Sequence, residues 1–143
     1  MHRLQSLFKL NILLYVMILC SAVECRHCEF MPIYITNKST EPIYVHHVRG
    51  YDVDPETYDL AVLFEENSLI KIPIDSTERV YLFSTLDGEV VQSVERFIIL
   101  KEGTLVDNSS EEIIEKRIYD NWCELVYSEM ETINFNWVYT GND

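Results

Sequence analysis

The chain has 143 residues, and its 24 acidic side chains against 11 Lys and Arg give a formal net charge of −13. This balance disfavours binding to nucleic acids or to anionic membrane surfaces, which attract clustered Lys and Arg. Nearly half of the residues are hydrophobic, 12% are aromatic, and Gly and Pro are sparse, a composition that argues against disorder and predicts one folded domain with a modest core.

The N-terminus has the three-part layout of a secretory signal peptide. A basic start precedes the almost entirely apolar residues 10–23, and small residues follow. The apolar run is shorter than the roughly 20 residues that span a bilayer. We therefore expect a signal peptide over 1–25, a single domain over 26–143, a secreted, extracellular protein, and no membrane span after signal removal. The alternatives are cleavage after Ala22 and retention of the segment as a signal anchor.

The cysteines fit an oxidising compartment. Cleavage after Cys25 leaves two, Cys28 and Cys123, for which we expect one disulfide bond. Cleavage after Ala22 leaves Cys25 as well, unpaired or paired between chains. The Cys25-x-x-Cys28 spacing also occurs in redox motifs and zinc sites, but no strand–helix pattern surrounds it here, and zinc would need further ligands from the few histidines.

Two sequons follow the expected signal peptide, at Asn37-Lys38-Ser39 and Asn108-Ser109-Ser110. In a secreted protein such sites lie on exposed turns and carry glycans. The sequence therefore predicts a glycoprotein modified at Asn37 and Asn108.

Alternation of apolar and polar residues predicts a series of half-buried strands. Asp87-Gly88 between two β-rich runs predicts a tight hairpin turn, and Pro73 places its strand at a sheet edge. The apolar run 60–64 is compatible with a short strand or a turn. The expected strands are 31–37, 42–49, 68–74, 79–85, 89–94 and 96–101.

The last third of the chain has a different pattern from the strands that precede it. Ser109 and Glu112 form a capping box, and Ile114, Ile118 and Trp122 recur at helical spacing, so we expect one helix over 109–122. Residues 132–139 alternate again and predict a final strand. The predicted fold is mainly β, a small antiparallel β-sandwich of about seven or eight strands with one helix in the C-terminal half before the last strand.

The middle of the chain resembles the β-domain of the von Hippel–Lindau tumour suppressor family. The likeness covers about 70 residues and lies in three motifs, namely Asn37-Lys38-Ser39, Tyr81-Leu82-Phe83 and Asp87-Gly88. It implies a small β-sandwich. Members of that family work inside cells as substrate receptors of a ubiquitin ligase, and their pocket holds a His and a Trp. In this chain Arg79 and Tyr81 stand at those two positions. We therefore carry over the fold and not the function.

Two polar clusters merit attention. His46 and His47 are adjacent on an expected strand and so point to opposite faces, which argues against a shared metal and leaves one packed and one surface histidine, or a pH-sensing one. The acidic loop offers weak calcium candidates. These are Asp52, Asp54, Glu56 and Asp59. The glycine that a helix-loop-helix calcium site requires at its sixth position is replaced by Thr57.

The sequence contains no nucleophile elbow, zinc-protease motif or phosphate-binding loop. We therefore expect no enzyme and no cofactor, and predict a protein-binding module for an extracellular, plausibly basic partner. An aromatic contact surface could come from the tyrosines and the last strand, although such residues more often complete a core. The alternatives are a structural or self-associating protein, and a carbohydrate-binding domain that would use Trp122 or Trp137. Oligomeric state is left open.

Overall fold

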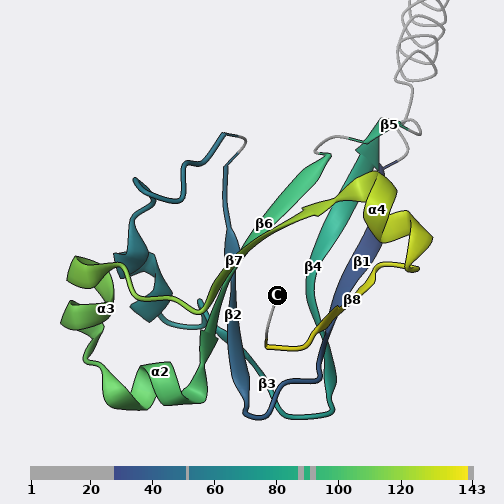
Figure 1. Ribbon diagram of the computed structural model, residues 1–143. Helices are drawn as coiled ribbons and strands as arrows, with labels where there is room; N and C mark the ends of the chain where they lie inside the picture. The colour runs from purple at the N-terminus through teal and green to yellow at the C-terminus, as the bar shows by residue number, and fades with distance from the viewer. Residues whose placement is uncertain (1–27, 51, 87–88, 91–92, 142–143) are drawn as a thin grey trace, which may run out of the picture.

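A computed structural model describes residues 28–50, 52–86, 89–90 and 93–141. Within them, eight strands form two four-stranded sheets (Figure 1), which confirms the predicted mainly β sandwich. The signal-peptide prediction lies outside the described residues. The strands are β1 (Cys28–Asn37), β2 (Ile43–Val48), β3 (Ile70–Ile72), β4 (Thr77–Leu86), β5 (Glu89–Val90), β6 (Val94–Lys101), β7 (Asn121–Val126) and β8 (Asn136–Tyr139). The helices are the 3-10 helix η1 (Leu60–Phe64), α2 (Glu102–Asp107), α3 (Ser110–Lys116) and α4 (Tyr127–Thr132).

Sheet 1 has the strand order β5-β4-β1-β8, and sheet 2 has the order β3-β2-β6-β7. The pairing is antiparallel except between β1 and β8, which run parallel. Helix α4 carries the chain from β7 in sheet 2 across to sheet 1 (Figure 1), where β8 joins the free edge of β1. The expected all-antiparallel arrangement therefore fails at this last strand.

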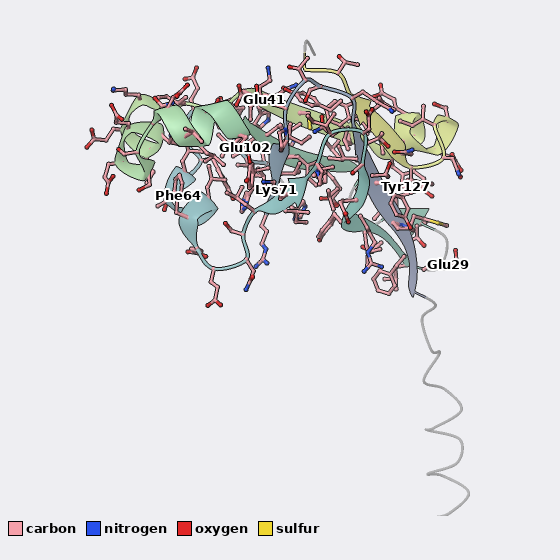
Figure 2. The ribbon with its side chains drawn as sticks, turned by 90° about the horizontal axis from the view of Figure 1, so that it is seen from below. Glu29, Glu41, Phe64, Lys71, Glu102 and Tyr127 are labelled. Carbon is pink, nitrogen blue, oxygen red and sulfur yellow. The ribbon has the colours of Figure 1, made fainter. Side chains whose placement is uncertain are left out.

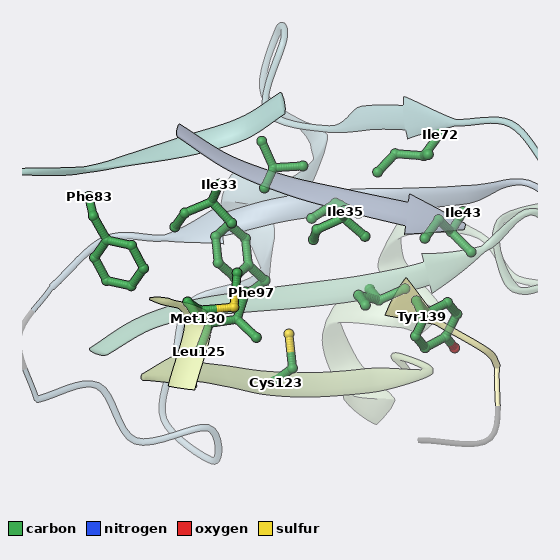
Figure 3. Close-up of a cluster of buried hydrophobic side chains, with 13 residues drawn as sticks. Ile33, Ile35, Ile43, Ile72, Phe83, Phe97, Cys123, Leu125, Met130 and Tyr139 are labelled. Atoms are coloured by element: carbon green, nitrogen blue, oxygen red, sulfur yellow. The ribbon is translucent and has the colours of Figure 1, made fainter. Parts of the chain in front are cut away.

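The main core lies between the two sheets. It is built by inward-facing side chains of both, because alternate residues of a strand point to the same face. In Figure 3, Ile33 and Ile35 of β1 face Phe97 of β6, and Tyr139 of β8 closes one end. All four side chains are almost completely buried.

A second apolar cluster covers the other face of sheet 2. Val48, Ile98 and Leu100 point outward from the sheet and pack against Leu60 and Leu63 of η1. Helices α2 and α3 complete this layer (Figure 1). Lys71 of β3 and Glu102 of α2 form an exposed ion pair at its margin (Figure 2).

The expected helix over 109–122 is shorter in the structure. The capping box at Ser109 is present, but α3 ends at Lys116, and Arg117 adopts a left-handed conformation with φ 53°. Trp122 therefore lies in β7, and the prediction that it belongs to the same helix as Ile114 is wrong. Ile114 of α3 and Trp122 of β7 pack against the same apolar cluster from two different elements.

The other differences between the predicted and the observed elements are local. Residues 60–64 form the 3-10 helix η1, and the final strand starts only at Asn136 because α4 and a left-handed pair, Asn134 and Phe135, precede it. Strand β3 lies at a sheet edge, as Pro73 predicts. Strands β4 and β5 pair as predicted for a hairpin, while its turn at 87–88 lies outside the described residues.

Cys123 is buried in the main core between the sheets (Figure 3). Its expected partner, Cys28, is the first residue of β1, and the Cys28 side chain lies outside what the structure describes. The disulfide therefore stays a prediction. No helix among the described residues is long and apolar enough to cross a membrane.

Candidate functional site

The sandwich is open at one corner, between β2 and β4. Strand β3 pairs only with residues 43–45 of β2, so residues 46–48 have no strand neighbour on that side within the described chain. A pocket of about 520 Å³ lies there, and we call it the histidine pocket. Its lining comprises His46, His47, Arg49, Tyr58, Val62, Glu65, Glu66, Asn67, Ser68, Ile70, Val80 and Tyr81.

His46 joins three segments at the pocket wall. Its Nδ1 lies 3.0 Å from the Ser68 carbonyl oxygen and its Nε2 lies 2.9 Å from the Tyr58 hydroxyl. A carbonyl can only accept, so Nδ1 carries the proton and the Tyr58 hydroxyl donates to Nε2. Burial lowers the pKa of His46, although the Ser68 hydrogen bond partly opposes this effect. The ring is therefore neutral near pH 7 and serves as a structural bridge.

His47 points the other way, toward the space between the sheets. Its Nε2 lies 2.7 Å from Oε2 of Glu95, a side chain that is itself buried. The imidazole stacks on Tyr81 of β4, with ring centroids 3.6 Å apart, and also contacts Phe97. His47 thus connects β2 to the opposite sheet. The prediction that the two histidines point to opposite faces is confirmed by these separate contacts.

The mouth of the pocket carries charge. Glu65 and Glu66 are exposed on the segment after η1, and Arg49 is exposed after β2. With His46 neutral, two carboxylates oppose one guanidinium at this mouth. Burial also raises the pKa of the Tyr58 phenol, so its hydroxyl keeps its proton. The pocket is therefore a polar, mildly acidic hollow with aromatic walls.

A second hollow, of about 420 Å³, adjoins the first across β4. It is lined by Phe30, Arg79, Val80, Tyr81, Leu82 and Ser84. Val80 and Tyr81 therefore border both hollows. Val80 is the extra residue of a β-bulge, because Tyr34 pairs with Arg79 while Ile33 pairs with Tyr81.

The calcium candidates do not converge. No group of three or more His, Cys, Asp or Glu in the described ranges could hold a metal ion. Asp54 accepts a hydrogen bond from the Glu56 backbone, and Asp59 caps η1 by accepting from Ala61. Asp52 is exposed. Asp54 and Asp59 therefore stabilise turns of this loop.

The structure argues against a glycan on Asn37. Its side chain is 0% exposed, and its Nδ2 donates to the carbonyl oxygens of Glu41 and Ile72. A glycan would replace one of the two Nδ2 hydrogens and break one of these bonds, and the fully buried side chain leaves no space for it, so we correct this expectation. Asn108 is half-buried, and its Nδ2 donates to Thr104 at the end of α2. Glycosylation at Asn108 stays a prediction.

The aromatic residues divide between core and surface. Trp122 packs in the second cluster and Trp137 packs against the main core, and both side chains are half-buried. Tyr139 is buried, Tyr44 is half-buried, and Tyr34 is exposed. Tyr51 lies outside the described residues.

Sequence reasoning missed Tyr58 and Glu95, and it met Tyr81 only through the resemblance to a family whose pocket residues differ. Tyr58 lies in the acidic loop, where only the carboxylates have a spacing that indicates a possible site. Glu95 is a single acidic residue among many, and only the fold shows that it is buried beside His47. The alternation of residues 42–49 indicated that the two histidine rings point to opposite faces, but it did not indicate which ring faces the interior.

Neither a protein-family model, nor a curated protein, nor a solved structure matches this chain. The resemblance to the von Hippel–Lindau β-domain therefore stays a prediction about fold.

Proposed function

We propose that this chain is a secreted, acidic, non-catalytic protein-binding module that uses the histidine pocket and its mouth to bind a basic extracellular partner. The observation that carries the proposal is the open corner itself. A hollow of about 520 Å³ with aromatic walls lies where β2 lacks a strand neighbour among the described residues. Hollows lined by aromatic side chains with a few placed polar groups are typical recognition sites.

The charges support a basic partner. Glu65 and Glu66 stand at the mouth of the pocket, and the whole chain carries −13. Such a field accelerates encounters with positively charged proteins and makes association sensitive to salt. The signal-like start supports an extracellular partner, since a secreted protein meets its partners outside the cell.

The test is capture of partners from extracellular fluid, followed by affinity measurement with matched variants. The variant Glu65→Lys/Glu66→Lys reverses the charge at the mouth. The control Glu129→Lys/Glu131→Lys makes the same change in net charge on the exposed side of α4. We expect the first pair to weaken binding by about tenfold or more, which corresponds to about 1.4 kcal/mol. An equal loss in both pairs would show that net charge, and not this pocket, governs binding.

A further inference from the structure

The two histidines of the pocket wall differ in what their ring nitrogens meet. Nε2 of His47 lies 2.7 Å from a carboxylate oxygen of Glu95, so a proton on His47 is balanced by that carboxylate. The ring nitrogens of His46 meet the Ser68 carbonyl oxygen and the Tyr58 hydroxyl instead. A proton added to His46 therefore brings a positive charge into the wall without a carboxylate bound to the ring.

Protonation of His46 also reverses one hydrogen bond of the wall. The neutral ring accepts from the Tyr58 hydroxyl, whereas a protonated imidazole donates from both nitrogens, so the hydroxyl must turn and accept. The loop that carries Tyr58 is held independently, because Arg117 donates to the carbonyl oxygens of Pro55 and Tyr58. The main effect of acid at this site is therefore a change in the charge of the pocket.

Charged and titratable groups surround His46 on each neighbouring element. They are His47 and Arg49 at the end of β2, Tyr58 of the acidic loop, Glu65 and Glu66 after η1, and the ion-paired Arg96 and Glu124 of β6 and β7. Burial is the largest cause that lowers the pKa of His46, while the charge of Glu65 raises it. The charge at the mouth and the charge of the ring thus influence each other. By linkage, a cation bound beside Glu65 disfavours protonation of His46, and a protonated His46 weakens the binding of that cation.

We propose that the histidine pocket releases its basic partner in acid, and that His46 is the residue that senses the acid. The inference rests on the proposed function, because a protonated His46 repels only a cationic partner. Near pH 7 the ring is neutral, and two carboxylates at the mouth oppose the single guanidinium of Arg49. In acid the ring becomes a second cation and cancels this excess, before Glu65 and Glu66 themselves take up protons at about pH 4. One proton taken up on release limits the change in the dissociation constant to about tenfold per pH unit.

The experiment measures the affinity of an amidated hexa-arginine peptide by calorimetry, from about pH 7 to about pH 5 at one ionic strength, since salt screens the attraction. We expect the dissociation constant to rise about threefold or more over this range. In His46→Gln, whose side chain is polar but takes up no proton, the rise should stay below about twofold, the part that the carboxylates alone supply. The matched control His47→Gln removes the other histidine of the wall and should keep the rise.

A second measurement needs no variant. The ring protons of His46 are followed by nuclear magnetic resonance through the same pH range, with and without saturating peptide. Because the linkage is reciprocal, the midpoint of the His46 titration should be lower in the complex. An unchanged midpoint overturns the inference.

Binding that is equally strong at both ends of the pH range, or that weakens equally in the native chain and in His46→Gln, also overturns it. The proposed function is tested separately, near pH 7, with Glu65→Lys/Glu66→Lys. If this pair weakens peptide binding and the pH dependence is absent, the pocket binds a basic partner without sensing acid. If it binds the peptide as tightly as the control Glu129→Lys/Glu131→Lys, the proposed function fails, and this inference fails with it.

Discussion

Replacement of Asn37 by Ala should destabilise the fold by about 4 kcal/mol. The Asn37 side chain makes four hydrogen bonds, with Nδ2 donating to Glu41 and Ile72 and Oδ1 accepting from the backbone and hydroxyl of Ser39. Each such bond contributes about 1 kcal/mol net, and more when a buried partner is left unsatisfied. Because Asn37 ends β1 in sheet 1 and Ile72 ends β3 in sheet 2, the change also removes a link between the sheets.

Urea unfolding measured on chain made in bacteria isolates this effect, since no N-glycan is then present. The matched control is Lys38→Ala, which keeps the sequon and removes only the exposed ion pair of Lys38 with Asp75. Exposed pairs contribute at most about 1 kcal/mol. A loss below about 1 kcal/mol for Asn37→Ala, or a glycan found on Asn37 in chain made by eukaryotic cells, would refute the reasoning.

Three further predictions concern pH, packing and redox state. Burial lowers the pKa of His46 from 6.5, so the unfolded chain binds a proton more readily than the folded chain. The contribution of His46 to the free energy of unfolding is therefore fully present above about pH 6.5. It falls as the pH drops below that value, by at most about 1.4 kcal/mol per pH unit. His46→Gln should flatten that slope between pH 6.5 and 5 in unfolding experiments, and an unchanged slope would exclude His46 as its source. Phe97→Ala should destabilise the main core by about 3–5 kcal/mol in the same assay, and a change under 1 kcal/mol would mean that the two sheets do not pack on this ring. Intact-mass analysis of secreted chain should detect one disulfide between Cys28 and Cys123, whose loop closure contributes on the order of 4 kcal/mol; labelling of both thiols without reduction would contradict it.

The strands were the most predictable part of the fold. Alternation in residues 31–37 identified β1, the apolar run 96–101 identified β6, and Pro73 correctly placed β3 at an edge. These signals are local, because burial of one sheet face leaves a period of two in the sequence. The turn residues between the strands indicated where each strand ends.

The end of α3 and the crossing from sheet 2 to sheet 1 through α4 could not be predicted in the same way. Helix α3 ends because Arg117 adopts a left-handed conformation, and α4 is one short turn-like helix with a buried Met130. Neither feature leaves a periodic pattern. The parallel pairing of β8 with β1 depends on contacts about 100 residues apart in the sequence, and no local signal specifies them.

The candidate site was predicted only in part. The adjacent pair His46-His47 drew attention, and alternation correctly separated the two rings. Their partners Tyr58, Tyr81 and Glu95 come from a loop and from two other strands. The sequon at Asn37 misled for a related reason, since the same Asn-x-Ser that accepts a glycan in an exposed turn also forms a buried, hydrogen-bonded turn.

Hydrogen–deuterium exchange tests the proposed binding site most directly. The chain is compared alone and in complex with a captured basic partner. We expect slower exchange in the complex at residues 65–68 and 80–81, which line the histidine pocket. Protection confined to the helical layer of α2 and α3, with the pocket segments unchanged, would contradict it.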